Sequence, residues 1–164
     1  MEQALRREKS TLAFSGFGAI VFGIWICLKS ILYELFAKSY LSGLFESTGS
    51  GPLERRTAML VLLGCAIAAM LLHLYIGLRA IREAKGGKKR HSFYLVLAAL
   101  LLLLNAAEIP VGIAAMHVDS NLMDALCDLL LELAECVNLA LLLTAAVRLR
   151  RLKREAEEAS DHAA

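Results

Sequence analysis

Four long apolar segments restrict the fold of this chain more than any other feature. They lie within about residues 11–36, 57–83, 92–116 and 122–154. About 20 consecutive apolar residues in a helix span the hydrocarbon core of a bilayer. The sequence therefore predicts an all-α protein, a bundle of four transmembrane helices.

Composition supports this class and disfavours others. Of the 164 residues, 58% are hydrophobic, whereas soluble domains are nearer 45–50% apolar. The net charge is +2, and no basic stripe with interleaved aromatic residues predicts nucleic-acid binding. The expected surroundings are a lipid bilayer, and no nucleic-acid partner is expected.

The chain is predicted to form one membrane domain over residues 1–155, followed by a polar C-terminal tail at 156–164. The connections after the second and third segments are short, so these helices are expected to be antiparallel neighbours.

Basic residues predict the orientation in the membrane, because cytoplasmic loops are enriched in Lys and Arg. With four spans, 14 of the 18 Lys and Arg residues fall on one side. They are Arg6, Arg7, Lys9, Arg79, Arg82, Lys85, Lys88, Lys89, Arg90, Arg148, Arg150, Arg151, Lys153 and Arg154. Both termini are therefore expected in the cytoplasm, and the plasma (inner) membrane is the default location.

Polar residues of the last segment gather on one helical face. At 100° per residue they lie within an arc of about 120°. A carboxylate at the centre of a transmembrane helix costs about 2.5–3.5 kcal/mol on insertion scales. The polar face must therefore meet protein, water or an ion. Its members are Asn121, Asp124, Asp128, Glu132, Glu135 and Asn138.

Other segments supply polar groups at matching depths. Straight helices would pair Lys29 with Asp128 and place Glu108 opposite Glu132. Pro110 should free the carbonyl oxygen of the residue four positions earlier, which would add an oxygen ligand beside Glu108. Ser15, Ala19 and Gly23 recur every four residues, so another helix is expected to approach the first one closely.

This pattern predicts an acidic intramembrane site that binds or conducts a cation or protons. The expected ion or proton ligands are Glu108, Asp128, Glu132 and Glu135. The expected supporting residues are Lys29, His73, Asn105, Asp124 and Asn138. His73 taken alone is more typical of a buried, hydrogen-bonded histidine than of a metal ligand.

The alternative is a non-catalytic membrane subunit whose polar face docks a membrane partner or a second copy of the chain. An enzyme is disfavoured, because the chain carries no P-loop, GxSxG, HExxH or strand-linked GxGxxG motif. The sequence identifies neither a metal nor a cofactor.

Overall fold

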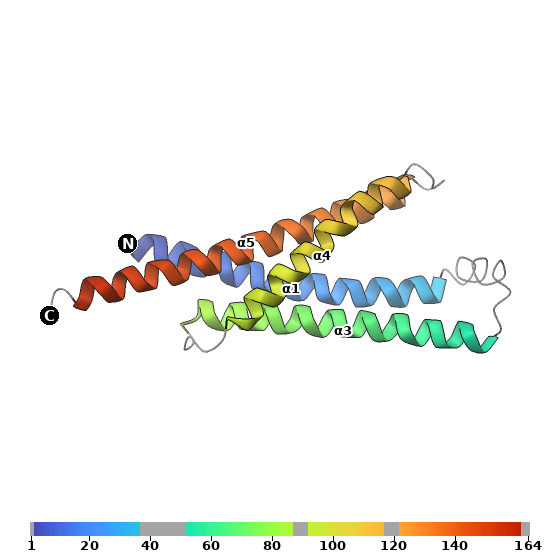
Figure 1. Ribbon diagram of the computed structural model, residues 1–164, viewed down its shortest axis with the longest axis horizontal. Coiled ribbons are helices and arrows are strands. Elements are labelled where there is room, and N and C mark those ends of the chain that lie inside the picture. Colours follow the sequence, from blue (N-terminus) through green and yellow to red (C-terminus); the bar gives the residue numbers. More distant parts are fainter. Residues whose placement is uncertain (1, 37–51, 87–91, 117–121, 162–164) are drawn as a thin grey trace. The chain divides into compact units, whose positions relative to one another are not determined.

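The described residues of this computed structural model are 2–36, 52–86, 92–116 and 122–161, and they form four helices. In chain order these are α1 (Glu2–Phe36), α3 (Pro52–Ala84), α4 (Phe93–Met116) and α5 (Leu122–Asp161) (Figure 1). The predicted all-helical class is confirmed. Asn121, at the start of the predicted polar face, lies outside the described residues.

Three helices extend beyond the predicted segments because their polar ends are stabilised locally. α1 begins at Glu2 rather than near residue 11, and Arg6 forms an i,i+4 ion pair with Glu2 at 2.6 Å. α3 begins at Pro52, and proline suits a first helical position because its missing N–H would be unpaired there anyway. The expected polar tail is helical as far as Asp161, because short-range ion pairs support an exposed helix.

All four helices are long and apolar enough to cross a membrane. The candidate spans are Glu2–Leu32, Leu60–Ala84, Phe93–Pro110 and Leu126–Ala156. Each presents large apolar side chains to its surroundings, including Phe14, Leu60, Leu103 and Leu130. Extended exposed apolar surface is rare on soluble monomers. These observations support membrane localisation.

The chain divides into two compact units. The first comprises Met1–Ala19 and Tyr75–Ala164, and the second comprises Ile20–Leu74. Within the first unit, α4 and α5 run in opposite directions and pack together (Figure 1), as the short connection predicted.

Buried positions on α4 and α5 alternate in steps of three and four residues. This spacing is typical of helices that pack side by side with a small crossing angle. On α5 the buried series is Glu135, Leu139, Leu142, Ala146 and Leu149, and on α4 it is Tyr94, Ala98 and Leu101, followed by the half-buried Asn105. The inner surface is therefore apolar apart from a few defined polar residues.

Small residues of α1 allow another helix to approach closely, as predicted. In the first unit Ser15 is buried, and a Cβ added at Gly16 would lie 2.9 Å from the carbonyl oxygen of Gly77. In the second unit, a Cβ added at Gly23 would lie 2.6 Å from the Cβ of His73. Both contacts join α1 to α3, and neither leaves room for a larger side chain.

Gly16→Ala should destabilise the protein, since the new methyl group would meet the α3 backbone. The expected loss is about 1–3 kcal/mol, the usual cost of overpacking. Thermal unfolding in detergent measures it, with Gly64→Ala as the matched control, because nothing lies within 4 Å of a Cβ added there. The control should be neutral or stabilising by up to about 1 kcal/mol. Equal behaviour of the two variants would contradict the close packing of α1 on α3.

Candidate functional site

A hydrogen bond between α4 and α5 connects the two polar residues of their packed surfaces. Asn105 Nδ2 donates to Glu135 Oε1 at 2.6 Å. Glu135 is only 7% exposed, although it occupies a position in a series that is otherwise apolar. Buried polar groups need such partners, so this bond fixes how α4 and α5 face each other.

Two further predicted ligands, Glu132 and Glu108, belong to the same pair of helices. The charges of Glu135, Glu132 and Glu108 all act on the thiol of Cys136, so the three side chains lie in the same stretch of the α4–α5 pair. Oε2 of Glu132 is buried, whereas Glu108, on α4, is exposed. A common site for the four predicted ligands, including the direct facing of Glu108 and Glu132, stays a prediction.

On α5, Glu135 is the last described residue that is buried in the direction of the α4–α5 connection. Among the described side chains of residues 122–134 on α5, none is buried, and the same holds for those of 102–116 on α4. On the other side of Glu135, buried residues continue along α5 to Leu149. The fourth predicted ligand, Asp128, is half-buried.

Asn138 has a structural partner on another helix. Its Nδ2 donates to the carbonyl oxygen of Ser15 at 3.1 Å. Its Oδ1 would lie 2.5 Å from a Cβ added at Gly18, so the amide occupies space that a glycine leaves open. Asn138 thus ties α5 to α1 one turn away from Glu135, and its predicted support of an ion site stays a prediction.

The remaining supporting residues are placed individually. His73 is 1% exposed, and its Nδ1 lies 2.8 Å from the carbonyl oxygen of Ala69, as expected of a hydrogen-bonded histidine. Lys29 is half-buried in the second unit, and its predicted pairing with Asp128 stays a prediction. The side chain of Asp124 lies outside the described residues.

Pro110 lies inside α4, which continues to Met116. Its ring nitrogen cannot donate a hydrogen bond to the carbonyl of Ala106. That carbonyl oxygen lies within one helical turn of Glu108, where the sequence predicts an additional oxygen ligand.

The carboxylates do not form a metal centre within the described ranges. No group of three or more His, Cys, Asp or Glu side chains there could hold a metal ion.

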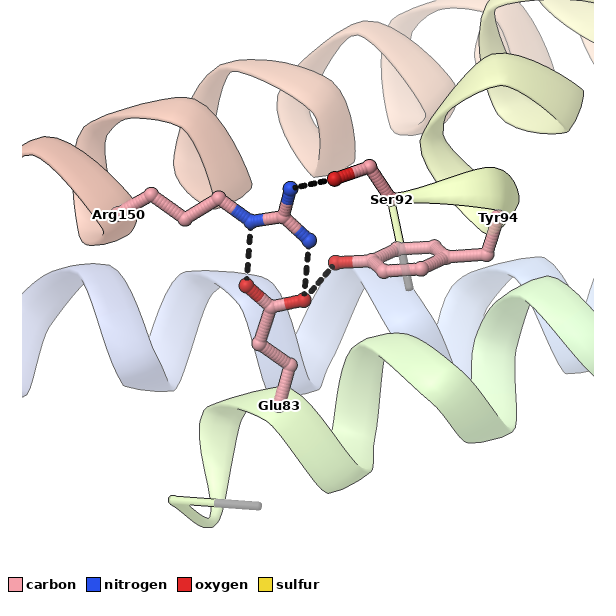
Figure 2. Close-up of polar contacts among 4 residues, drawn as sticks. All are labelled: Glu83, Ser92, Tyr94 and Arg150. Carbon is pink, nitrogen blue, oxygen red and sulfur yellow. Dashed lines mark hydrogen bonds and ion pairs between the residues drawn. The ribbon is translucent and has the colours of Figure 1, made fainter. Parts of the chain in front are cut away.

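A second polar cluster joins three helices near the basic ends of α3 and α5 (Figure 2). Arg150 binds Glu83 through two hydrogen bonds, Nε to Oε1 at 2.7 Å and Nη2 to Oε2 at 2.8 Å. Tyr94 donates to Glu83 Oε2 at 2.6 Å, and Arg150 Nη1 donates to Ser92 Oγ at 2.7 Å. The planar guanidinium of Arg150 thus links α3 and α5 to the start of α4. Its two hydrogen bonds to one carboxylate have the bidentate geometry of strong Arg–carboxylate pairs.

Sequence reasoning missed this cluster because it treated the basic residues only as determinants of orientation. One pattern in the sequence could have indicated part of it. Glu83 and Tyr94 flank the short connection between α3 and α4 at similar distances, so an antiparallel hairpin brings them together. Nothing comparable singles out Arg150 from its basic neighbours.

No protein-family model, curated protein or solved structure matches the chain. The functional interpretation therefore depends on the chemistry of the two polar clusters.

Arg150→Met should destabilise the protein by about 3 kcal/mol, because Glu83 would keep its burial and lose its cationic partner. The side chains of Arg150 and Glu83 are 24% and 12% exposed. Arg151→Met is the matched control, since Arg151 pairs with Glu155 on the same helix at 81% and 43% exposure. Exposed pairs contribute at most about 1 kcal/mol. Equal losses in thermal unfolding would refute the structural role of Arg150.

Proposed function

We propose that this chain is a small multi-pass membrane protein that binds or conducts protons or another cation at an intramembrane acidic site. Glu135, Glu132 and Glu108 are the proposed carriers, Asp128 lies toward the entrance, and Asn105 positions Glu135. The observation that carries the proposal is the burial of Glu135 in an otherwise apolar series within the candidate span Leu126–Ala156.

Protons are the ligand that this geometry favours. An ionised carboxylate is costly in an apolar medium unless it is paired, and carboxylates within transmembrane segments commonly mark proton or ion pathways. Asn105 donates one hydrogen bond to one oxygen of Glu135. Protonation of Glu135 would remove a negative charge from an otherwise apolar helix surface.

The proposed setting is the plasma (inner) membrane, with both termini in the cytoplasm and the four helices forming an antiparallel bundle. The distribution of Lys and Arg supports this orientation, because 14 of the 18 fall on the side of both termini, and cytoplasmic loops are enriched in these residues.

A second function, docking of a membrane partner, has its own supporting observation. Glu108 is exposed on α4 within the candidate span Phe93–Pro110. A carboxylate on the surface of a transmembrane helix is costly unless protein or water covers it. A partner helix with a Lys or Arg at this depth, or a second copy of the chain, could supply that cover.

Thermal stability of the purified protein across pH and a panel of cations separates these functions. If the acidic site takes up protons, wild type should gain stability as the pH falls through the titration of the site. A ligand that binds only the folded state adds about 2.7 kcal/mol at a hundredfold excess over its Kd. Glu132→Gln and Glu135→Gln should lose that dependence on pH, or on one cation, while still folding.

Glu158→Gln makes the same chemical change on the exposed end of α5 and should behave like wild type. If all four proteins share one pH and cation profile, the acidic site is not a ligand site, and docking becomes the better account. Docking would then predict a polydisperse isolated chain that becomes homogeneous with its partner.

A further inference from the structure

We infer that the basic end of the first unit binds the headgroup of an anionic phospholipid through Arg148 and Arg151 of α5. This inference goes beyond the proposed function and does not depend on the acidic site. The occupant is a lipid whose phosphate gives its headgroup a net negative charge, held where the apolar part of α5 ends.

All four helices change between polar and apolar sequence near their basic ends. The apolar part begins at Leu12 on α1 and at Phe93 on α4. It ends at Ala84 on α3 and at Val147 on α5. Each helix therefore has its own boundary between residues suited to hydrocarbon and residues suited to headgroups or water.

Contacts between helices hold these four boundaries at one level. Arg148 of α5 forms an ion pair with Glu8 of α1 at 3.7 Å. Arg150 binds Glu83 at the end of α3 and Ser92 at the start of α4. In a chain that spans a membrane, this common level is where the headgroups of one leaflet begin.

Arg148 and Arg151 lie on the outer face of α5, whereas Arg150 is directed inward. The side chains of Arg148 and Arg151 are 72% and 81% exposed. They are three residues apart and so lie about 60° from each other around the helix, and Arg148 lies about 160° from Arg150. The interhelical contacts at this level all involve residues of the first unit.

Both guanidinium groups keep N–H donors that a phosphate can use. The contact of Arg148 with Glu8 is longer than a hydrogen bond, and Arg151 donates only Nε to Glu155 at 2.9 Å. An arginine side chain carries five N–H donors, and exposed ion pairs of this kind contribute little to stability. The guanidinium geometry matches the oxygens of a phosphate group.

The local charge favours an anionic headgroup over a zwitterionic one. Residues 145–155 of α5 carry five Lys or Arg side chains and one acidic side chain, Glu155. A zwitterionic headgroup would bring its own cation toward these side chains, whereas an anionic headgroup brings only negative charge. Clusters of Lys and Arg at the end of a transmembrane helix are typical of sites for anionic lipids.

The outer face of α5 also provides an apolar surface for the acyl chains. Val147 and Leu141 are exposed on the membrane side of Arg148. Thr144, between them, bonds to carbonyl groups of its own helix, so its hydroxyl is satisfied in an apolar medium. Leu141 lies about 10 Å along the helix from Arg148. This apolar surface beside the arginines favours a lipid over a soluble phosphate or an acidic protein segment.

Native mass spectrometry of the full chain in detergent provides the test. The protein is titrated with phosphatidylglycerol or with phosphatidylcholine of the same acyl chains, and the Kd of the first bound lipid is measured. The test variant combines Arg148→Gln with Arg151→Gln. The matched control combines Arg55→Gln with Arg56→Gln, which removes the same charge at the opposite end of α3.

Wild type should bind phosphatidylglycerol more tightly than phosphatidylcholine. The test variant should bind phosphatidylglycerol about 30-fold more weakly, because each basic residue near an anionic lipid surface contributes about fivefold. Its affinity for phosphatidylcholine should stay close to that of wild type. The control variant should keep the preference for phosphatidylglycerol.

Three results would overturn the inference. Equal affinity of wild type for the two lipids would remove the anionic lipid, whether or not the variants fold, and would leave an acidic protein segment as the candidate occupant. A preference that survives in the test variant, or that is lost equally in the control, would place the lipid elsewhere. Displacement of phosphatidylglycerol by an equal concentration of glycerophosphoglycerol, which lacks acyl chains, would indicate a site for soluble phosphates.

Discussion

The hydrogen bond between Asn105 and Glu135 is the interaction on which the arrangement of α4 and α5 depends. It lies where two apolar helix surfaces meet, and Glu135 is 7% exposed there. A single polar residue in such a surface specifies helix register at a cost in stability, as buried asparagines do in coiled coils. Sliding either helix by one turn would leave a carboxylate facing apolar side chains, so the chemistry of the site and the alignment of the helices depend on one bond.

The two polar clusters lie at different levels of the same unit, and they differ in the kinds of side chain that they bring together. Around Glu83 and Arg150, opposite charges meet in a closed network that draws α3, α4 and α5 together. Around Glu135, Asn105 donates to a buried carboxyl group, and Glu132 and Glu108 lie in the same stretch of the α4–α5 pair. The first arrangement stabilises the folded chain, whereas the second supplies the carboxyl groups that we propose as proton carriers. An apolar region containing Leu139 and Leu142 separates them.

Much of this architecture could be predicted from the sequence because its causes are local or periodic. Apolar length predicts the four helices, and small residues at intervals of four predict the close approach at Ser15. The α5 polar face follows from helical geometry alone. Which residues pair across two helices is harder to predict from the sequence, because several side chains lie at each depth. Nothing in the spacing selects Asn105 as the partner of Glu135, or Arg150 among its basic neighbours. The burial of Glu135 could not be predicted, because it depends on how whole helices pack. The extensions of the helices to Glu2 and Asp161 could not be predicted from apolar length, because they depend on local ion pairs.

Infrared difference spectroscopy of the protein in lipid membranes tests the central claim most directly, because a protonated carboxyl group has its own carbonyl stretching band. Proton uptake by the acidic site predicts a band that grows as the pH falls and that is lost or reduced in Glu135→Gln. The same band should persist unchanged in Glu158→Gln. A spectrum in which no carboxyl band changes with pH, or in which Glu135→Gln leaves the change intact, would contradict the account.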